Sequence, residues 1–445
     1  MGKGNMKIDA RNFKGTRDYL PNEMILRNQM IEKIRRSFEV FGFVPLETPA
    51  LEYLDVLTGK YGEEGDKLIY RLNYKGGSVA GMKYDLTVPL ARVMTQHNDI
   101  VLPFKRYQIQ PVWRADRPQV RQGRFREFYQ CDADIVGVKS VLADTEIIAL
   151  IHNILSQLEI GQFLIRINHR KILSGIRESL GLKEAMEIDL CRGIDKLDKI
   201  GIDGVKEELG RLGFTDPVMD NLFQLLSLEG SHTEVFKQLK DTLTKSETGL
   251  QGIDELKNIF ESLEIMNIPM EALKIDLHLA RGLDYYTGTI YESSSIDLPH
   301  IGSLTGGGRY DRLIGSFGSK DLPAVGTTIG LDRIATVLTQ LGKMADKNSV
   351  TQILVTIFDE TMIHQSMKIA SSLRKHGFKT ELYYEPVKLK KQFSYADKQK
   401  IPFVIVLGPD ETAKGQVTLK DLTVGKQQQL DSGTLISYLE DRLSE

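Results

Sequence analysis

Apolar residues recur at every third or fourth position along residues 22–41, where Ile34 and Phe38 share one side of a helix. Gly42 ends this pattern, and an extended segment then runs to Pro49. Proline favours a sheet edge or an interface, because it cannot donate a hydrogen bond to a neighbouring strand. The beginning of the chain therefore predicts a helix followed by an edge strand.

Extended and helical patterns alternate along the rest of the chain. A hairpin is expected at residues 68–74 and 80–86, around a Lys-Gly-Gly turn, and a helix from Thr87. Beyond it we expect two long extended segments at residues 104–114 and 124–136, and helical patterns at 140–158 and over most of 171–265. Two more extended segments at 274–280 and 284–292 and a helix at 331–341 follow. The glycine run at 306–308 is typical of a turn. Strand and helix patterns alternate again over residues 353–407, which predicts a separate small α/β domain.

Composition excludes several protein classes. The chain has 445 residues, 41% hydrophobic and 27% charged, with a net charge of -2. It contains no uncharged apolar stretch of about 18 residues and no secretion signal, so we expect a soluble, cytoplasmic protein that contacts no membrane. Cys131 and Cys191 lack CxxC spacing and the histidines form no ligand cluster, so we expect neither a disulfide framework nor a protein-bound zinc.

A basic segment carries the first sign of chemistry. Residues 105–126 contain seven lysines and arginines but only one acid, Asp116. Charge alone leaves a solvated basic surface equally open. Strand alternation, however, places a run of polar residues on one face: Arg124, Arg126, Phe128, Gln130, Asp132 and Asp134. Arginine forks suit phosphates and carboxylates suit an ammonium or imidazole group, so this face is expected to bind a polar ligand that carries both charges.

Five segments in a fixed order resemble the motifs of class II aminoacyl-tRNA synthetases. The segment from Gly42 to Pro49 resembles motif 1, residues 112–116 with 123–130 resemble motif 2, and residues 326–333 resemble motif 3. Two more segments are similar to the signatures of the histidine-specific members: Arg281-Gly282-Leu283-Asp284-Tyr285-Tyr286 and Gly307-Gly308-Arg309-Tyr310-Asp311. The resemblance covers nearly the whole chain and is to the histidyl-tRNA synthetase family.

The segment Tyr84-Asp85-Leu86-Thr87-Val88-Pro89 has the form common in eukaryotic members, which predicts a eukaryote-like branch. Asp85 and Asp116 stand where bacterial members usually have glutamate.

The resemblance implies a role for each matching residue. Arg114 and Arg281 would flank the reacting phosphate as catalytic residues, while Phe128 would stack on adenine. Arg333 would reach the outer phosphates, and Asp116 and Arg124 would complete the ATP site. The residues expected to bind histidine are Asp85, Leu86, Thr87, Arg114, Gln130, Asp134, Arg281, Tyr285 and Tyr286. Among them, Asp134 and Tyr286 would hold the two imidazole nitrogens, and Asp85, Thr87 and Gln130 the α-ammonium group.

The fold and the partners follow from the same resemblance. It implies an α+β protein whose antiparallel sheet is flanked by helices. We expect a catalytic core at residues 1–170 and 268–342, a helical insertion at 171–267 and a C-terminal α/β anticodon-binding domain at 348–445.

ATP with Mg²⁺, L-histidine and tRNA(His) are the implied ligands, and a homodimer the implied assembly. No GxxxxGK[ST] loop is present, so arginines on a sheet would hold ATP. The alternative is a non-catalytic paralogue that binds histidine, of the ATP phosphoribosyltransferase regulatory subunit type. The insertion is hypothesised to clamp the acceptor stem of tRNA.

Overall fold

The computed structural model describes residues 9–58, 67–73, 79–120, 123–281, 285–318, 321–343 and 348–443. Contacts divide the chain into two compact units: Met1–Asp18 with Gln29–Lys343, and Tyr19–Asn28 with Met344–Glu445. Within the described residues, no helix has both the length and the apolar character needed to cross a membrane.

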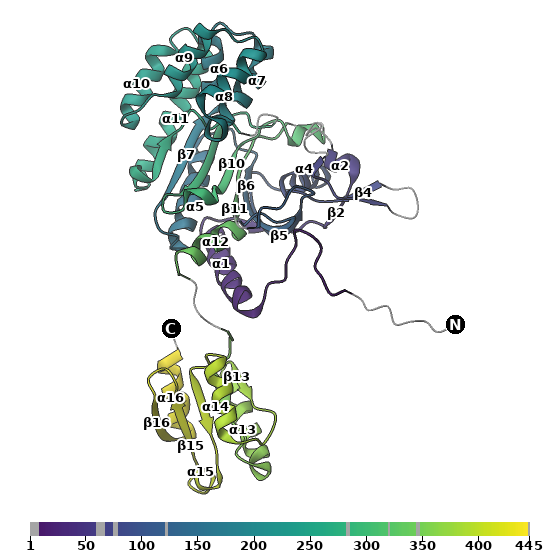
Figure 1. Cartoon of the computed structure of the whole chain (residues 1–445), viewed down its shortest axis with the longest axis vertical. Coiled ribbons are helices and arrows are strands. Elements are labelled where there is room, and N and C mark those ends of the chain that lie inside the picture. The colour runs from purple at the N-terminus through teal and green to yellow at the C-terminus, as the bar shows by residue number, and fades with distance from the viewer. Residues whose placement is uncertain are drawn as a thin grey trace, which may run out of the picture. The chain divides into compact units, whose positions relative to one another are not determined.

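An eight-stranded sheet forms the centre of the larger unit (Figure 1). Its strands lie in the order β1 (Val44–Pro45), β5 (Phe104–Trp113), β6 (Glu127–Val136), β11 (Ala324–Gly330), β10 (Ser303–Arg309), β9 (Thr289–Ser295), β7 (Phe163–His169) and β8 (Leu273–Ile275). All inner pairs are antiparallel, and only the edge strands β1 and β8 pair in parallel. The predicted α+β class with an antiparallel sheet is therefore confirmed.

Helices and a small sheet surround these strands. The helices are α1 (Pro21–Val40), α2 (Leu54–Thr58), α4 (Thr87–Gln96), α5 (Leu142–Gln157) and α12 (Leu331–Gln340), and the small sheet has the order β2 (Leu51–Tyr53), β4 (Val79–Met82), β3 (Arg71–Asn73). Helix α1 buries Met30, Ile34 and Phe38, which are four residues apart and so lie on one face. The Phe38 ring stacks 5.3 Å from Tyr107 of β5, which fixes α1 against the sheet.

A block of helices lies between β7 and β8 in the sequence, although these two strands pair with each other in the sheet (Figure 1). It consists of α6 (Arg170–Ser179), α7 (Glu187–Asp195), α8 (Leu197–Arg211), α9 (Asp216–Leu226), α10 (His232–Thr242) and α11 (Glu247–Ile265). Helices α6 and α11 cross closely, since a Cβ on Gly175 would lie 2.6 Å from the Cα of Gly249. Residues 171–265 are thus helical as expected, while the predicted domain boundaries stay predictions.

The smaller unit contains a five-stranded sheet in the order β13 (Thr380–Leu382), β12 (Ile353–Val355), β14 (Phe403–Val406), β15 (Gln416–Asp421), β16 (Lys426–Asp431). Its helices are α13 (Ile363–Lys375), α14 (Leu389–Lys398), α15 (Pro409–Ala413) and α16 (Ser432–Leu443). Alternate residues of the central strands enter two separate cores: Ile353 and Ile405 pack with α13 and α16, whereas Leu354 and Val404 pack with α14. Helices therefore cover both faces of this sheet.

Several sequence expectations need correction. The glycine run 306–308 lies inside strand β10 and is not a turn. Strand β7 was not predicted, nor were β15, β16 and α16. The strand expected at 284–292 begins only at Thr289, because that is where pairing with β7 and β10 starts.

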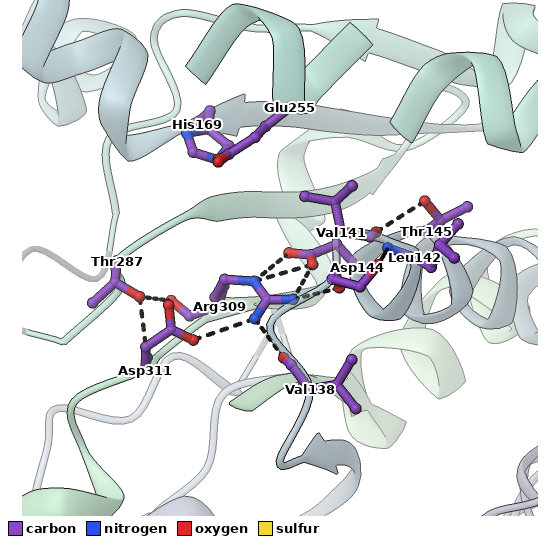
Figure 2. A network of polar contacts seen from close by, with 12 residues as sticks. Val138, Val141, Leu142, Asp144, Thr145, His169, Glu255, Thr287, Arg309 and Asp311 are labelled. Atoms are coloured by element: carbon purple, nitrogen blue, oxygen red, sulfur yellow. Dashed lines mark hydrogen bonds and ion pairs between the residues drawn. The ribbon is translucent and has the colours of Figure 1, made fainter. Parts of the chain in front are cut away.

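A buried ion pair joins β10 to helix α5 (Figure 2). The Arg309 guanidinium donates to both carboxylate oxygens of Asp144 and to the carbonyls of Val138 and Ser140. Asp144 is completely buried and Arg309 is 6% exposed. Arg309 belongs to one of the histidine-specific signatures, and its contacts within the chain are structural.

A second contact in Figure 2 joins the end of β7 to α11. His169 is buried; its Nδ1 accepts from the Lys171 backbone N–H, and its Nε2 lies 3.0 Å from Glu255. Burial alone would raise the pKa of Glu255, but hydrogen bonds from His169 and Lys171 outweigh it and lower that pKa to about 2. The first and last helices of the block are thereby tied to the central sheet.

We expect Asp144→Ala to destabilise the protein by about 3–5 kcal/mol, because it leaves the Arg309 charge buried without its partner. Urea unfolding of the full chain measures the change. Glu207→Ala is the control: it removes an exposed pair with Arg211 one helical turn away and is expected to have little effect. Equal stability of the two variants would show that the Arg309 pair is not a determinant of stability.

Candidate active site

A cavity of about 280 Å³ lies over strands β6, β10 and β11. Gly306 of β10 lines this cavity, and the described residues leave the space beside its Cα empty: the atom nearest to a Cβ built on Gly306 would be 3.9 Å away. The cavity is lined by seven of the residues predicted for the site: Arg114, Asp116, Arg124, Phe128, Gln130, Arg281 and Arg333. Residues that are up to 219 positions apart are thus brought into one hollow.

Arginines dominate this cavity. Arg114, Arg124, Arg281 and Arg333 all line it, and burial together with the neighbouring Arg124 lowers the pKa of Arg333. Such crowding of positive charge costs free energy unless an anion enters, because like charges in a partly buried site repel each other. The arrangement therefore favours a polyanion such as a triphosphate.

Backbone carbonyls hold two of these arginines in place. Arg114 donates from Nε to the Tyr84 carbonyl at 2.9 Å, and its guanidinium lies 5.1 Å from the centre of the Phe128 ring. Arg333, in the first turn of α12, donates to the Ser303 carbonyl at 2.5 Å. The Phe128 ring stands next to these cations and offers an aromatic surface to a base.

Arg281 is paired with carboxylates from two parts of the chain. It contacts Glu292 of β9 and lies 3.4 Å from Asp195, at the end of helix α7. Glu292 is 3% exposed and also pairs with Arg166 at 2.6 Å. A residue of the helical block thus reaches an arginine of the cavity.

The predicted histidine-binding residues lie beside the cavity. Asp85, Leu86 and Thr87 stand at the start of α4, where Asp85 accepts a 3.1 Å hydrogen bond from the Val88 N–H. The Leu86 side chain is fully buried in the core, and its carbonyl accepts from Arg106 at 3.3 Å. A ligand can therefore contact only the backbone atoms of Leu86.

Asp134 is held from two sides. Its carboxylate lies 2.7 Å from the buried guanidinium of Arg106 and accepts a hydrogen bond from the Tyr310 hydroxyl. A Cβ on Gly326 would lie 1.9 Å from an oxygen of Asp134, and one on Gly308 would lie 2.9 Å from the Tyr286 ring. These glycines leave room for the carboxylate and the tyrosine.

Several acids share this part of the site. Burial raises the pKa of Asp85 to about 6 and that of Asp132 to about 7, and it also raises the pKa of Asp134. Arg106, the cation paired with Asp134, offsets part of this effect. The rings of Tyr285 and Tyr286 lie 4.2 Å apart at the edge of the group. Negative charge is thus concentrated on one side of the site and positive charge on the other.

Comparison with known proteins agrees with this geometry. Residues 15–334 match the family described as Histidyl-tRNA synthetase, and residues 352–442 match the family described as Anticodon binding domain. The chain belongs to the histidyl-tRNA synthetase family. It is 46% identical to a Histidine--tRNA ligase of Cytophaga hutchinsonii, covering 93% of this chain and 96% of that protein. A Histidine--tRNA ligase of Porphyromonas gingivalis is 44% identical, covering 96% and 98%.

A crystal structure of histidyl-tRNA synthetase from Nostoc sp. PCC 7120 superposes with a TM-score of 0.89 at 35% identity, covering 98% of this chain and all of that one. The class II synthetase fold with a C-terminal anticodon-binding domain is thereby confirmed. These relatives are bacterial and do not support the eukaryote-like branch that the segment from Tyr84 to Pro89 suggested.

The structure separates the basic cluster at residues 105–126. Arg126 was expected on the ligand face but points to the N-terminal segment: it donates to the carbonyls of Asp116 and Lys14 and lies over the Phe13 ring. Strand β6 begins only at Glu127, so strict alternation does not extend back to Arg126. Lys105 pairs with Glu146 of α5. Only part of the cluster therefore serves the site.

Three residues of the site were given no functional role by the sequence analysis: Arg106, Glu292 and Tyr310. Asp132 was placed on the ligand face but was given no role of its own. Alternation along β5, in register with β6, places Arg106 opposite Asp134, and that pattern could have revealed the pair. Nothing in the sequence pairs Glu292 with Arg281, because that contact depends on the sheet order. Gly282 to Asp284 of the first signature lie outside the described residues.

The raised carboxyl pKa values predict how pH affects ligand binding. In the unfolded chain Asp85 and Asp132 lose their protons near pH 4, whereas in the folded chain they keep them up to about pH 6 and 7. The free energy of unfolding is therefore higher at pH 4, and this contribution is lost as pH rises through 6 to 7. A cation bound beside the ionised carboxylates restores stability above pH 7. We therefore expect saturating histidine to raise the melting temperature more at pH 8 than at pH 6.

Thermal melting with and without histidine tests this, and Asp85→Asn, which removes one titrating group, should reduce the difference between the two pH values. An equal rise at both pH values in the unsubstituted protein would contradict it.

Proposed function

We propose that this protein activates L-histidine with ATP to form histidyl-adenylate, and then transfers the histidyl group to the 3′ end of tRNA(His), releasing AMP and pyrophosphate. One observation carries the proposal: a cavity lined by arginines lies over β6, the strand that carries the buried carboxylates Asp132 and Asp134. ATP matches the first and the ammonium and imidazole groups of histidine match the second.

Charge and position account for the activation step. The carboxylate of histidine attacks the α-phosphorus of ATP; a new P–O bond forms and the bond to pyrophosphate breaks. The substrate supplies the nucleophile, so no base from the enzyme is required, and the chain's part is to align the reactants and stabilise charge. Arg114 and Arg281 are the catalytic residues beside the reacting phosphate, Phe128 stacks on adenine, and Arg333 holds the outer phosphates.

Other side chains contribute contacts to ATP and to the imidazole ring of histidine. Asp116 lies 3.3 Å from Arg124 and orients it toward ATP. Asp134 and Tyr286 hold the imidazole ring. Mg²⁺ accompanies ATP as a counterion, and Glu292, a buried carboxylate beside Arg281, fits the requirement that one or two carboxylates assist the phosphates in holding it.

The C-terminal domain is proposed to bind the anticodon. Helix α14 and its flanks expose a row of lysines: Lys388, Lys390, Lys391, Lys398 and Lys400. Tyr384 is 86% exposed and can stack on a base, whereas Tyr395 is partly buried and donates to Glu381. A clamp on the acceptor stem stays the hypothesis for the helical block.

ATP–pyrophosphate exchange tests the activation step. Exchange should depend on histidine alone among the twenty amino acids, and Arg281→Ala should lower its rate by about 10²- to 10³-fold, as for the loss of a charge-stabilising donor. Arg192→Ala is the control, because Arg192 is an exposed arginine on the neighbouring helix α7. Histidine binding without exchange would instead support the regulatory-subunit alternative.

A homodimer is also proposed, supported by an uncovered apolar sheet face. In the small sheet, Leu51 pairs with Met82 while Tyr53 and Leu72 both pair with Ala80, so these side chains share one face. Leu51 is 53% and Tyr53 65% exposed. Both follow the motif 1 proline, Pro49, which points to a second copy as the partner of this face.

Leu51→Glu is expected to convert the dimer into monomers, because a dimer interface would have to bury the new charge. Sedimentation velocity measures the change. Ile265→Glu, at an exposed apolar position at the end of α11, is the control and should leave the assembly intact. A Leu51→Glu variant that remains dimeric would place the interface elsewhere.

A further inference from the structure

Three buried side-chain oxygens of β6 lack a hydrogen-bond partner within the described residues: Gln130 Oε1, Asp132 Oδ1 and Asp134 Oδ2. Asp134 Oδ2 forms an ion pair with Arg106 at 2.7 Å, whereas the other two oxygens have neither kind of contact in the described part of the chain. Asp132 is 3% exposed and Gln130 is 7% exposed. A buried acceptor without a partner costs about 1–3 kcal/mol, and more when it is charged. Two of them, two positions apart on one strand face, indicate a missing donor.

Thr328 of β11 determines which oxygens of Gln130 and Asp132 lack a hydrogen-bond partner among the described residues. It pairs with Asp132 across the sheet, and its hydroxyl accepts a 3.1 Å hydrogen bond from the Gln130 amide nitrogen. The same hydroxyl hydrogen-bonds the Asp132 carboxyl. With both side chains tied to Thr328, the Gln130 amide oxygen and one Asp132 oxygen remain free. Gln130 and Thr328 both line the cavity, and Asp132, which is hydrogen-bonded to Thr328, lies next to these lining residues.

The neighbouring carboxylate is engaged differently. Asp134 already faces Arg106 at 2.7 Å and accepts from Tyr310. Asp132 is close enough to feel the Arg106 charge, but no ion pair between them is formed in the described structure. Asp132 therefore has capacity for another cation, and Asp134 has much less.

A primary ammonium group suits these two acceptors. It carries a full positive charge and three N–H donors on one atom, so it can satisfy a carboxylate and an amide oxygen together. An imidazole ring presents its two nitrogens on different sides and cannot give both hydrogen bonds from one atom. The negative charge of Asp85, which acts on Asp132, adds to the attraction.

We infer that Asp132 is a further substrate-binding residue, which together with the amide oxygen of Gln130 receives the α-ammonium group of the bound amino acid. The inference rests on the proposed function and adds to it a residue that orients the substrate. With its ammonium fixed on β6, the amino acid directs its carboxylate toward Arg114 and the phosphate site.

The test compares two histidine analogues in Asp132→Asn and in the unsubstituted protein. Histidinol keeps the ammonium group but lacks the carboxylate, whereas imidazolelactate keeps the carboxylate and has a hydroxyl in place of the ammonium. Asp132→Asn should raise KM for histidine and Ki for histidinol by about 10- to 100-fold, the range for loss of a charged hydrogen bond. Ki for imidazolelactate and KM for ATP should stay near the values of the unsubstituted protein.

Asp134→Asn is the matched comparison, because it acts at the imidazole end and should weaken both analogues. If Asp132→Asn does not fold, Thr328→Val carries the same test: it nearly preserves volume, releases the Asp132 carboxyl and should also weaken histidinol more than imidazolelactate.

An unchanged KM for histidine in Asp132→Asn would overturn the inference. Equal weakening of both analogues would also overturn it, since that result means a structural role through Arg106. Absence of histidine-dependent exchange in the unsubstituted protein would instead overturn the proposed function.

Discussion

The active site depends on a carboxylate that is paired with a guanidinium inside the protein. Asp134 is 3% exposed, and an isolated carboxylate at such depth would take up a proton rather than remain ionised. Arg106, itself completely buried, opposes this from 2.7 Å away on the neighbouring strand and offsets part of the rise that burial causes in the pKa of Asp134. The antiparallel register of β5 and β6 places the two residues opposite each other, so the ion pair depends on the pairing of these strands.

Other features of the fold serve this pair. The Tyr310 hydroxyl donates to Asp134, and Tyr310 follows Arg309, whose bonds to Asp144 attach the end of β10 to helix α5. Gly326 contributes by having no side chain where the carboxylate lies. The second histidine signature is therefore largely structural: its glycines give space, its arginine fixes the strand, and its tyrosine orients the carboxylate of Asp134.

Charged contacts connect the helical block to the central sheet and to Arg281 of the cavity. His169 and Glu255 tie the block to the end of β7, and Asp195 of α7 lies 3.4 Å from Arg281. A triphosphate that attracts Arg281 competes with Asp195 and Glu292 for the same guanidinium. The contact between Asp195 and Arg281 therefore joins the helical block to the cavity of arginines.

Sequence patterns predicted the regular parts of this structure better than its irregular ones. Alternation correctly placed Phe128, Gln130, Asp132 and Asp134 on one face, because β6 is continuous there. It failed at Arg126, which precedes the strand. Strand β7 was missed because its seven residues run directly into helix α6. The glycine run was read as a turn, because its sequence does not reveal that neighbouring strands approach too closely for side chains.

The division of charge across the site explains how the two substrates are aligned. Histidine is positive at its ammonium end and negative at its carboxylate, and ATP is negative throughout its phosphates. In the proposed reaction, buried acids at one end and arginines at the other would orient the amino acid before the chemical step. They would place its nucleophilic carboxylate among the cations that also attract ATP. Those cations screen the repulsion between the two anions. Bringing together like-charged reactants is thus the main task of the arginines, and it requires the acids of β6 to hold the other end of the amino acid.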